Sequence, residues 1–103
     1  MSDEQRQYTV VIHNEAAQMM YSHFQFLANV SIPAAQRLRT AFYDAFTSLE
    51  NMPHRCPAYH TRKALNAYRQ LVIGRYQIVF AIDEEAGSVN ICYVFDSRQD
   101  NDI

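Results

Sequence analysis

The first half of the chain begins with a short apolar segment and continues with apolar residues at helical spacing. Residues 8–13 are mostly β-branched or aromatic and too few for a helix, which predicts a strand. The helical pattern starts at Asn14, the expected side-chain cap, and Glu15 is a favourable charge in the first turn. The predicted apolar stripe of this helix comprises Ala17, Met20, Tyr21, Phe24, Leu27 and Ala28.

A second amphipathic helix is predicted directly after the first. Ser31 is its expected cap, and Pro33 lies in the first turn, where its missing N–H is tolerated. We expect the helix to end at Asn51-Met52-Pro53, because proline disfavours the helical conformation in the residue before it. The apolar face of this helix contains Ala35, Leu38, Phe42, Ala45, Phe46 and Leu49. Two helices with so short a connection predict a helical hairpin.

After Pro57 the period of the pattern changes from helical to alternating. Residues 67–73 and 76–83 predict two strands joined by a tight turn at Gly74-Arg75, and residues 88–95 predict a third. The order of elements is therefore β-α-α-β-β-β. Each helix has one apolar stripe and the sheet has one apolar face, so we expect an α+β fold with the helical hairpin packed on one face of a small, mostly antiparallel sheet.

Alternation along the last predicted strand also assigns faces to its side chains. Tyr93 shares its face with Ile91 and Phe95, which predicts that Tyr93 belongs to the core rather than to a functional surface. The opposite face carries Cys92 and Val94.

The composition is that of one globular domain. The chain has 103 residues, of which 49% are hydrophobic and 19% charged, with two Gly and three Pro, which excludes a disordered or collagen-like protein. We expect the domain at residues 8–100, with a flexible tail at 1–7 and a second tail at 101–103. Apolar runs fall well short of the ~20 residues of a membrane helix, and no secretory signal is recognised, so the expected location is the cytoplasm.

The sequence offers little for metal or cofactor chemistry. Cys56 and Cys92 are too few for a disulfide framework and form no C-x-x-C pair. His54 and His60 lie in a loop, but the residues around them do not have the spacing of a zinc site. Phosphate-binding glycine loops and the G-x-S-x-G motif are absent from the sequence. We therefore expect no metal and no cofactor.

The formal net charge of −2 hides an uneven distribution of charge. Between Glu50 and Asp83 there is no acidic residue. The same stretch contains the basic residues Arg55, Arg62, Lys63, Arg69 and Arg75. Two interpretations stay open here: a local basic face that contacts a polyanionic or acidic partner, or an ordinary solvated surface.

Three segments carry a family resemblance, together with the order of elements. They are Leu49…Met52-Pro53, the predicted hairpin Tyr68-Arg69-Gln70-Leu71-Val72…Arg75-Tyr76-Gln77-Ile78-Val79-Phe80-Ala81-Ile82, and Val89-Asn90-Ile91…Val94-Phe95-Asp96-Ser97-Arg98-Gln99-Asp100. Over residues 8–100 the chain resembles the RelE/ParE toxin superfamily of type II toxin–antitoxin systems. The resemblance implies one of two targets. RelE-like members cut mRNA in the ribosome, whereas ParE-like members poison DNA gyrase, and an antitoxin holds both inactive.

The residues at three positions favour the ParE-like branch. Leu71 stands where RelE-like nucleases have a second basic residue, Gln77 where they have an arginine, and Asp96 where a histidine is common. RNA cleavage needs cationic groups and an acid or base near the phosphate, and this set is depleted here. The resemblance therefore implies a gyrase-directed growth inhibitor of the plasmid-stabilisation type. Its candidate target contacts are Arg69, Arg75, Asp96, Arg98 and Gln99.

Two alternatives stay open at this point. In the first, the chain is a ribosome-dependent endoribonuclease in which Arg69, Arg75 and Arg98 stabilise the phosphorane and His60 is the acid or base. In the second, the fold is that of a toxin but toxicity has been lost.

The resemblance also implies a cognate antitoxin as partner. Met19 and Phe26 lie outside the predicted core stripe of the first helix, which makes them candidate antitoxin contacts, unless they fill the flanks of the core. The sequence leaves open whether the free protein is a homodimer.

Overall fold

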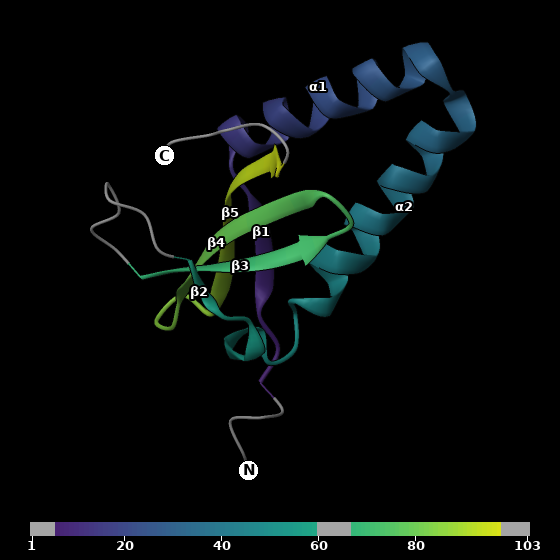
Figure 1. The fold of residues 1–103 in the computed structure, drawn as a ribbon. Coiled ribbons are helices and arrows are strands. Elements are labelled where there is room, and N and C mark those ends of the chain that lie inside the picture. Colours follow the sequence, from purple (N-terminus) through teal and green to yellow (C-terminus); the bar gives the residue numbers. More distant parts are fainter. Residues whose placement is uncertain (1–5, 60–66, 98–103) are drawn as a thin grey trace.

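The computed structural model describes residues 6–59 and 67–97 (Figure 1). Two helices and five strands follow one another in the predicted order, with one short strand added. The elements are β1 (Thr9–Ile12), α1 (Asn14–Val30), α2 (Ile32–Ser48), a 3-10 helix (Pro53–Arg55), β2 (Ala58–Tyr59), β3 (Tyr68–Ile73), β4 (Tyr76–Asp83) and β5 (Ser88–Asp96). The added element is β2, which was not predicted because two residues are too short to produce an alternating pattern.

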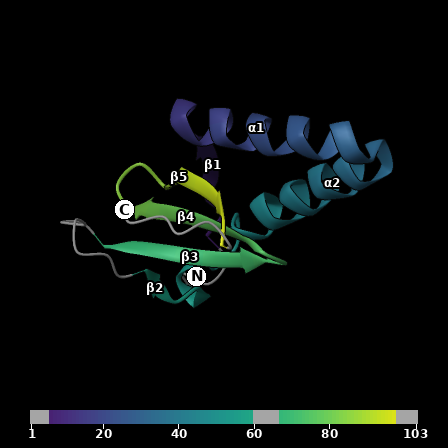
Figure 2. The same cartoon turned by 45° about the horizontal axis from the view of Figure 1, so that its top comes forward.

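The five strands form one mixed sheet in the order β1-β5-β4-β3-β2. Only the β1–β5 pair is parallel. The helical hairpin leads from β1, at one edge of the sheet, to β2 at the other edge. Both helices lie on the same face of the sheet, and the end of the hairpin projects beyond the strands (Figures 1 and 2). The predicted α+β architecture is confirmed. Among the described residues, neither helix is long and apolar enough to span a membrane.

The core lies between the hairpin and the sheet, and α2 contributes most of its helical part. All six residues predicted for the apolar face of α2 are buried. Phe42 is at the centre, with its ring within 6.1 Å, centroid to centroid, of the rings of Phe24, Phe46 and Tyr76. The strands contribute the fully buried side chains Ile78, Phe80, Val89, Ile91 and Val94 to the same cluster.

The start and the stripe of α1 differ from the prediction. His13 is the N-cap residue and makes no side-chain cap, so the predicted cap by Asn14 is wrong. Of the predicted stripe only Met20, Phe24 and Leu27 pack against the core, whereas the exposed residues are Ala17, Tyr21 and Ala28. The buried stripe of α1 therefore contains fewer residues than the apolar pattern predicts.

The boundaries of α2 agree with the prediction at its start and differ at its end. The Ser31 hydroxyl accepts a hydrogen bond from the Ala34 amide at 3.2 Å, as expected of the cap. The helix stops at Ser48, earlier than expected. Arg55 caps the C-terminal end of the helix, because its guanidinium donates a hydrogen bond to the Ser48 carbonyl at 3.2 Å.

A β-bulge in β5 changes which face its last residues occupy. Val79 pairs with Tyr93, but the next residue, Phe80, pairs with Ile91, so Cys92 is the extra residue. The alternation therefore reverses at Cys92. Tyr93 leaves the helix-facing side of the sheet, and the prediction that it shares the face of Ile91 in the core is wrong.

Candidate functional site

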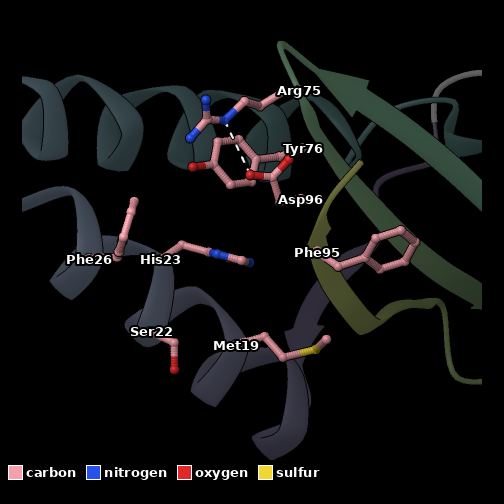
Figure 3. Close-up of a pocket in the computed structure, with 8 residues that line it drawn as sticks. All are labelled: Met19, Ser22, His23, Phe26, Arg75, Tyr76, Phe95 and Asp96. Atoms are coloured by element: carbon pink, nitrogen blue, oxygen red, sulfur yellow. Dashed lines mark ion pairs between the residues drawn. The ribbon is translucent and has the colours of Figure 1, made fainter. Parts of the chain in front are cut away.

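A groove of about 730 Å³ lies between α1 and the point where β4 begins and β5 ends (Figure 3). Its wall contains side chains from three segments that are distant in the sequence. They are Met19, Ser22, His23 and Phe26 from α1, Arg75 and Tyr76 from the β3–β4 hairpin, and Phe95 and Asp96 from β5. The groove thus joins Met19 and Phe26, the two candidate antitoxin contacts, with Arg75 and Asp96, two of the candidate target contacts.

The hairpin turn positions Arg75 at the edge of the groove. Gly74 adopts a φ of 58°, a left-handed conformation that favours glycine and closes the predicted tight turn. Tyr76 pairs with Asp96 in the sheet register, so the turn residue Arg75 lies beside the end of β5. Ser97, directly after β5, connects the end of this strand to the turn, since its amide and hydroxyl both donate to the Arg75 carbonyl, at 2.6 and 2.7 Å.

Arg75 and Asp96 form an ion pair at this edge. Arg75 Nε lies 3.3 Å from Asp96 Oδ2, with 38% of the arginine side chain and 11% of the aspartate side chain exposed. The guanidinium carbon also lies 5.7 Å from the centroid of the Tyr76 ring, within the range of a cation–π contact. Asp96 therefore contributes a neutralised carboxylate rather than a free negative charge in the groove.

His23 contributes a polar group to the α1 wall. Its Nε2 lies 3.1 Å from the Val94 carbonyl oxygen, so this nitrogen is the donor. The imidazole also meets the Tyr76 ring edge to face, with centroids 5.0 Å apart. These contacts hold His23 half-buried beside the groove.

Arg69 lies away from the groove and is engaged by the loop before β2. Its Nη1 donates to the carbonyls of His54 and Cys56, at 3.2 and 2.6 Å. Those bonds hold the loop against β3. A target contact by Arg69 stays a prediction. Three further candidates lie outside the described residues, namely His60, Arg98 and Gln99.

Comparison with known proteins identifies the family. The sequence model described as "ParE toxin of type II toxin-antitoxin system, parDE" matches residues 10–101. The chain belongs to the ParE toxin family. No curated protein sequence matches the chain.

Among solved structures, this ParE-family toxin is similar to the crystal structure of the toxin–antitoxin complex RelBE2 from Mycobacterium tuberculosis. The TM-score is 0.63 at 23% sequence identity, and the match covers 92% of this chain and 97% of the other. The likeness confirms the RelE/ParE-like fold.

The face of the sheet opposite the helices carries an aromatic patch, here defined as Tyr59, Tyr68, Tyr93 and Phe95. Tyr59 meets Phe95 edge to face, with centroids 6.4 Å apart, and Figure 3 shows the Phe95 ring turned away from the groove. The pKa of Tyr93 is raised by burial first, and then by the neighbouring charge of Glu15. The Tyr93 phenol is therefore neutral at physiological pH. Sequence reasoning missed this patch because the bulge at Cys92 has no signal in the alternating pattern.

A second polar cluster of the toxin lies at the other end of β4 and centres on Glu84. The Tyr8 hydroxyl donates to Glu84 Oε1 at 2.9 Å, Arg6 Nη1 lies 3.3 Å from the same oxygen, and His54 contacts Oε2. The hydrogen bond from Tyr8, followed by that from His54, lowers the pKa of the Glu84 carboxyl. Sequence reasoning missed this cluster, since its members come from three separate segments.

Neither the cluster nor the cysteines form a metal centre within the part of the chain that the structure describes. No group of three His, Cys, Asp or Glu side chains is placed there to hold a metal ion. Burial raises the pKa of the Cys56 and Cys92 thiols, so both are protonated near neutral pH.

Proposed function

We propose that this ParE-family toxin inhibits growth by acting on DNA gyrase and is neutralised by a cognate antitoxin. The match of the ParE family model to residues 10–101 carries this proposal. The residues that replace the basic set of RelE-like nucleases support it. Leu71 packs against the core, and the Asp96 carboxylate pairs with Arg75.

Arg75 is the described target-contact candidate with the greatest freedom to bind. Its charge lies at the edge of the groove, whereas Arg69 donates to two loop carbonyls. We therefore assign the gyrase contact to Arg75 and Asp96 at the groove, together with Arg98 and Gln99, which follow Asp96 in the sequence.

The experiment is a supercoiling and DNA-cleavage assay with purified gyrase. Loss of supercoiling together with trapped, cut DNA is the expected result. Arg75→Ala and Arg98→Ala should weaken the effect, and Arg39→Ala, on the exposed side of α2, is the matched control. An inactive wild-type protein at micromolar concentration would exclude gyrase as the target.

We assign antitoxin binding to the groove wall formed by Met19 and Phe26. Phe26 is 64% exposed and Met19 is half-buried, so an apolar partner would remove a large apolar area from water at this wall. Phe26→Asp should weaken antitoxin binding while the melting temperature stays close to that of the wild type. Equal losses of binding and of stability would refute the assignment.

One observation favours a second function, that of an RNA-cleaving enzyme. The aromatic patch places Tyr59, Tyr68 and Tyr93 on the open face of the sheet, where rings of this kind stack on unpaired bases. Induced cells would then show mRNA cut in phase with codons, and Tyr93→Ala, which removes the ring, would reduce the cutting. If induction neither arrests growth nor cuts mRNA, toxicity has been lost.

A further inference from the structure

The outer edge of β1 is open to pairing with a further strand. β1 stands at the end of the strand order β1-β5-β4-β3-β2 and pairs with β5 on one side. The Thr9 and His13 amides donate to backbone carbonyls on the β5 side, at 2.9 and 3.0 Å. Because alternate residues of a parallel strand direct their backbone groups to the same neighbour, Val10 and Ile12 direct theirs away from β5. Among the described residues, no strand pairs with that side.

The two edges of the sheet differ in how they are protected against pairing. At the opposite edge the short strand β2 lies beside β3, and the Pro57 carbonyl accepts a hydrogen bond from an amide of β3 at 3.0 Å. Pro57 and Arg69 place a proline and a charge there, and both oppose the addition of a strand. Residues 7–14, around β1, contain no proline, Asp, Glu, Lys or Arg. Val11 and Ile12 are apolar and 41% and 40% exposed, so the β1 edge has no such protection.

The backbone of this edge is complementary to a second copy of itself. In an antiparallel pair with the two-fold axis at Val11, Val10 of each copy is opposite Ile12 of the other, and both of these pairs exchange two hydrogen bonds. An axis at Val10 would set Ile12 against Tyr8, whose amide already donates to the Glu50 carbonyl at 2.9 Å. An axis at Ile12 would set Val10 against the first residue of α1. The register centred on Val11 therefore satisfies the most backbone groups.

The side chains and charges fit the same register. Opposite residues of an antiparallel pair share a face, so Val10, which packs against the core, meets Ile12 of the other copy on the helix side. Val11 meets its own copy on the face away from the helices. The charged residues nearest to the strand are Arg6 before it and Glu15 after it. An antiparallel pair brings the Arg6 end of one copy to the Glu15 end of the other, so charges of opposite sign approach each other.

We propose that the free toxin forms a symmetric dimer through β1, in which the two sheets join into one continuous sheet. The two-fold axis passes through Val11 perpendicular to the sheet, so both helical hairpins lie on the same face of the dimer. The interface does not include the groove, because β1 pairs with the first residues of β5 and the groove is lined by its last. This inference goes beyond the proposed function and requires neither gyrase nor the antitoxin.

The first test is the mass of the purified toxin in solution, measured by sedimentation from about 1 to about 100 μM, because so short an edge supports a weak dimer. The wild-type mass should rise towards twice that of the monomer as the concentration increases. Val11→Lys places two positive charges opposite each other and should raise the Kd of the dimer at least about tenfold. The matched control is Val72→Lys on β3, where Val72 is 54% exposed, and the Kd should stay unchanged.

A mixing experiment then tests the register. Val11→Glu alone should be as monomeric as Val11→Lys, because each variant repels its own copy across the two-fold axis. An equal mixture of the two variants should recover the dimer, since every lysine then faces a glutamate. Circular dichroism and thermal unfolding of each variant establish that it is folded.

The inference is overturned if the wild type stays monomeric over the whole range, if Val72→Lys weakens the dimer as much as Val11→Lys, or if the mixture stays monomeric. A monomeric toxin whose binding to the antitoxin is lost in Val11→Lys would assign the edge to the antitoxin, which also overturns it. The gyrase assay is independent of these results. A dimer without an effect on gyrase would leave the inference standing and remove the proposed function, and a monomer that inhibits gyrase would do the reverse.

Discussion

Arg75 Nε and Asp96 Oδ2 lie 3.3 Å apart and join the β3–β4 turn to the end of β5 at the groove. Removing the arginine leaves an aspartate side chain that is only 11% exposed without this partner. The arginine is partly exposed, so water screens its attraction to Asp96 and weakens the ion pair. We therefore expect Arg75→Met to lower the free energy of unfolding by about 1 kcal/mol.

Urea denaturation measures this change, and Arg39→Met is the matched control with an expected change within about 0.5 kcal/mol. In the double variant Arg75→Met/Asp96→Asn, part of the lost stability should return, since Asp96→Asn replaces the carboxylate that faced Arg75 with a neutral amide. A double variant as unstable as the sum of the two single variants would contradict the ion pair.

Phe42 and Tyr43 are adjacent in α2 but face opposite environments, so they form a natural pair for testing the core. Phe42 is 1% exposed and Tyr43 is 71% exposed. Phe42→Ala removes a ring that contacts three other rings, and the cavity should cost about 3–5 kcal/mol. Tyr43→Ala should change the free energy of unfolding by less than about 0.5 kcal/mol. Similar losses for both, by thermal or urea unfolding, would place the core elsewhere.

The lowered pKa of Glu84 predicts how the stability of the fold depends on pH. Its pKa is lower in the folded protein than its ordinary value of 4.5, chiefly because Tyr8 and then His54 hydrogen-bond to the carboxylate. A lowered folded-state pKa gives stability that is present above pH 4.5 and is lost as the pH falls through the folded-state pKa. We therefore expect acid destabilisation to be weaker in Glu84→Gln than in the wild type.

Unfolding curves between pH 3 and pH 7 measure this dependence. Tyr8→Phe removes the largest cause of the shift and should flatten the same region of the curve. Glu85→Gln, at the exposed neighbouring position, is the control for a change of net charge. If Glu85→Gln flattens the curve as much as Glu84→Gln, the cluster around Glu84 has no specific role.

The elements that were predictable are those whose pattern is local. Ser31 and Pro33 marked the start of α2, and Gly74 marked the hairpin turn, because caps and turns depend on residues only a few positions apart. The face of Tyr93 was not predictable. It depends on the Cys92 bulge, which is a property of the pairing between β4 and β5 and not of the β5 sequence alone.

Single residues of the groove were predictable from the sequence, but their arrangement around one groove was not. Met19 and Phe26 stood out because they fell outside the core stripe, and Arg75 and Asp96 because of the family resemblance. That all four line one groove depends on the Tyr76–Asp96 register and on the position of α1 over the sheet. Neither follows from periodicity within a single element.

Gly87 and Gly74 both adopt left-handed backbone conformations, with φ values of 67° and 58°, but their surroundings differ. A Cβ at Gly74 meets nothing within 4 Å, whereas a Cβ at Gly87 lies 2.9 Å from Arg6 Nη2. Gly74→Ala should therefore cost only the backbone strain of about 1 kcal/mol. Gly87→Ala should cost more, because the arginine must also give up its position over the turn.

The position of the Arg6 guanidinium allows the difference between Gly87→Ala and Gly74→Ala to be tested. Arg6 Nη2 donates to the Glu84 carbonyl at 2.5 Å, and the guanidinium carbon lies 4.9 Å from the Tyr8 ring centroid. In an Arg6→Ala background the close contact is gone, so Gly87→Ala and Gly74→Ala should lower the free energy of unfolding by the same amount. A difference that persists in that background would mean that the backbone of the β4–β5 turn, and not the packed guanidinium, makes glycine necessary at position 87.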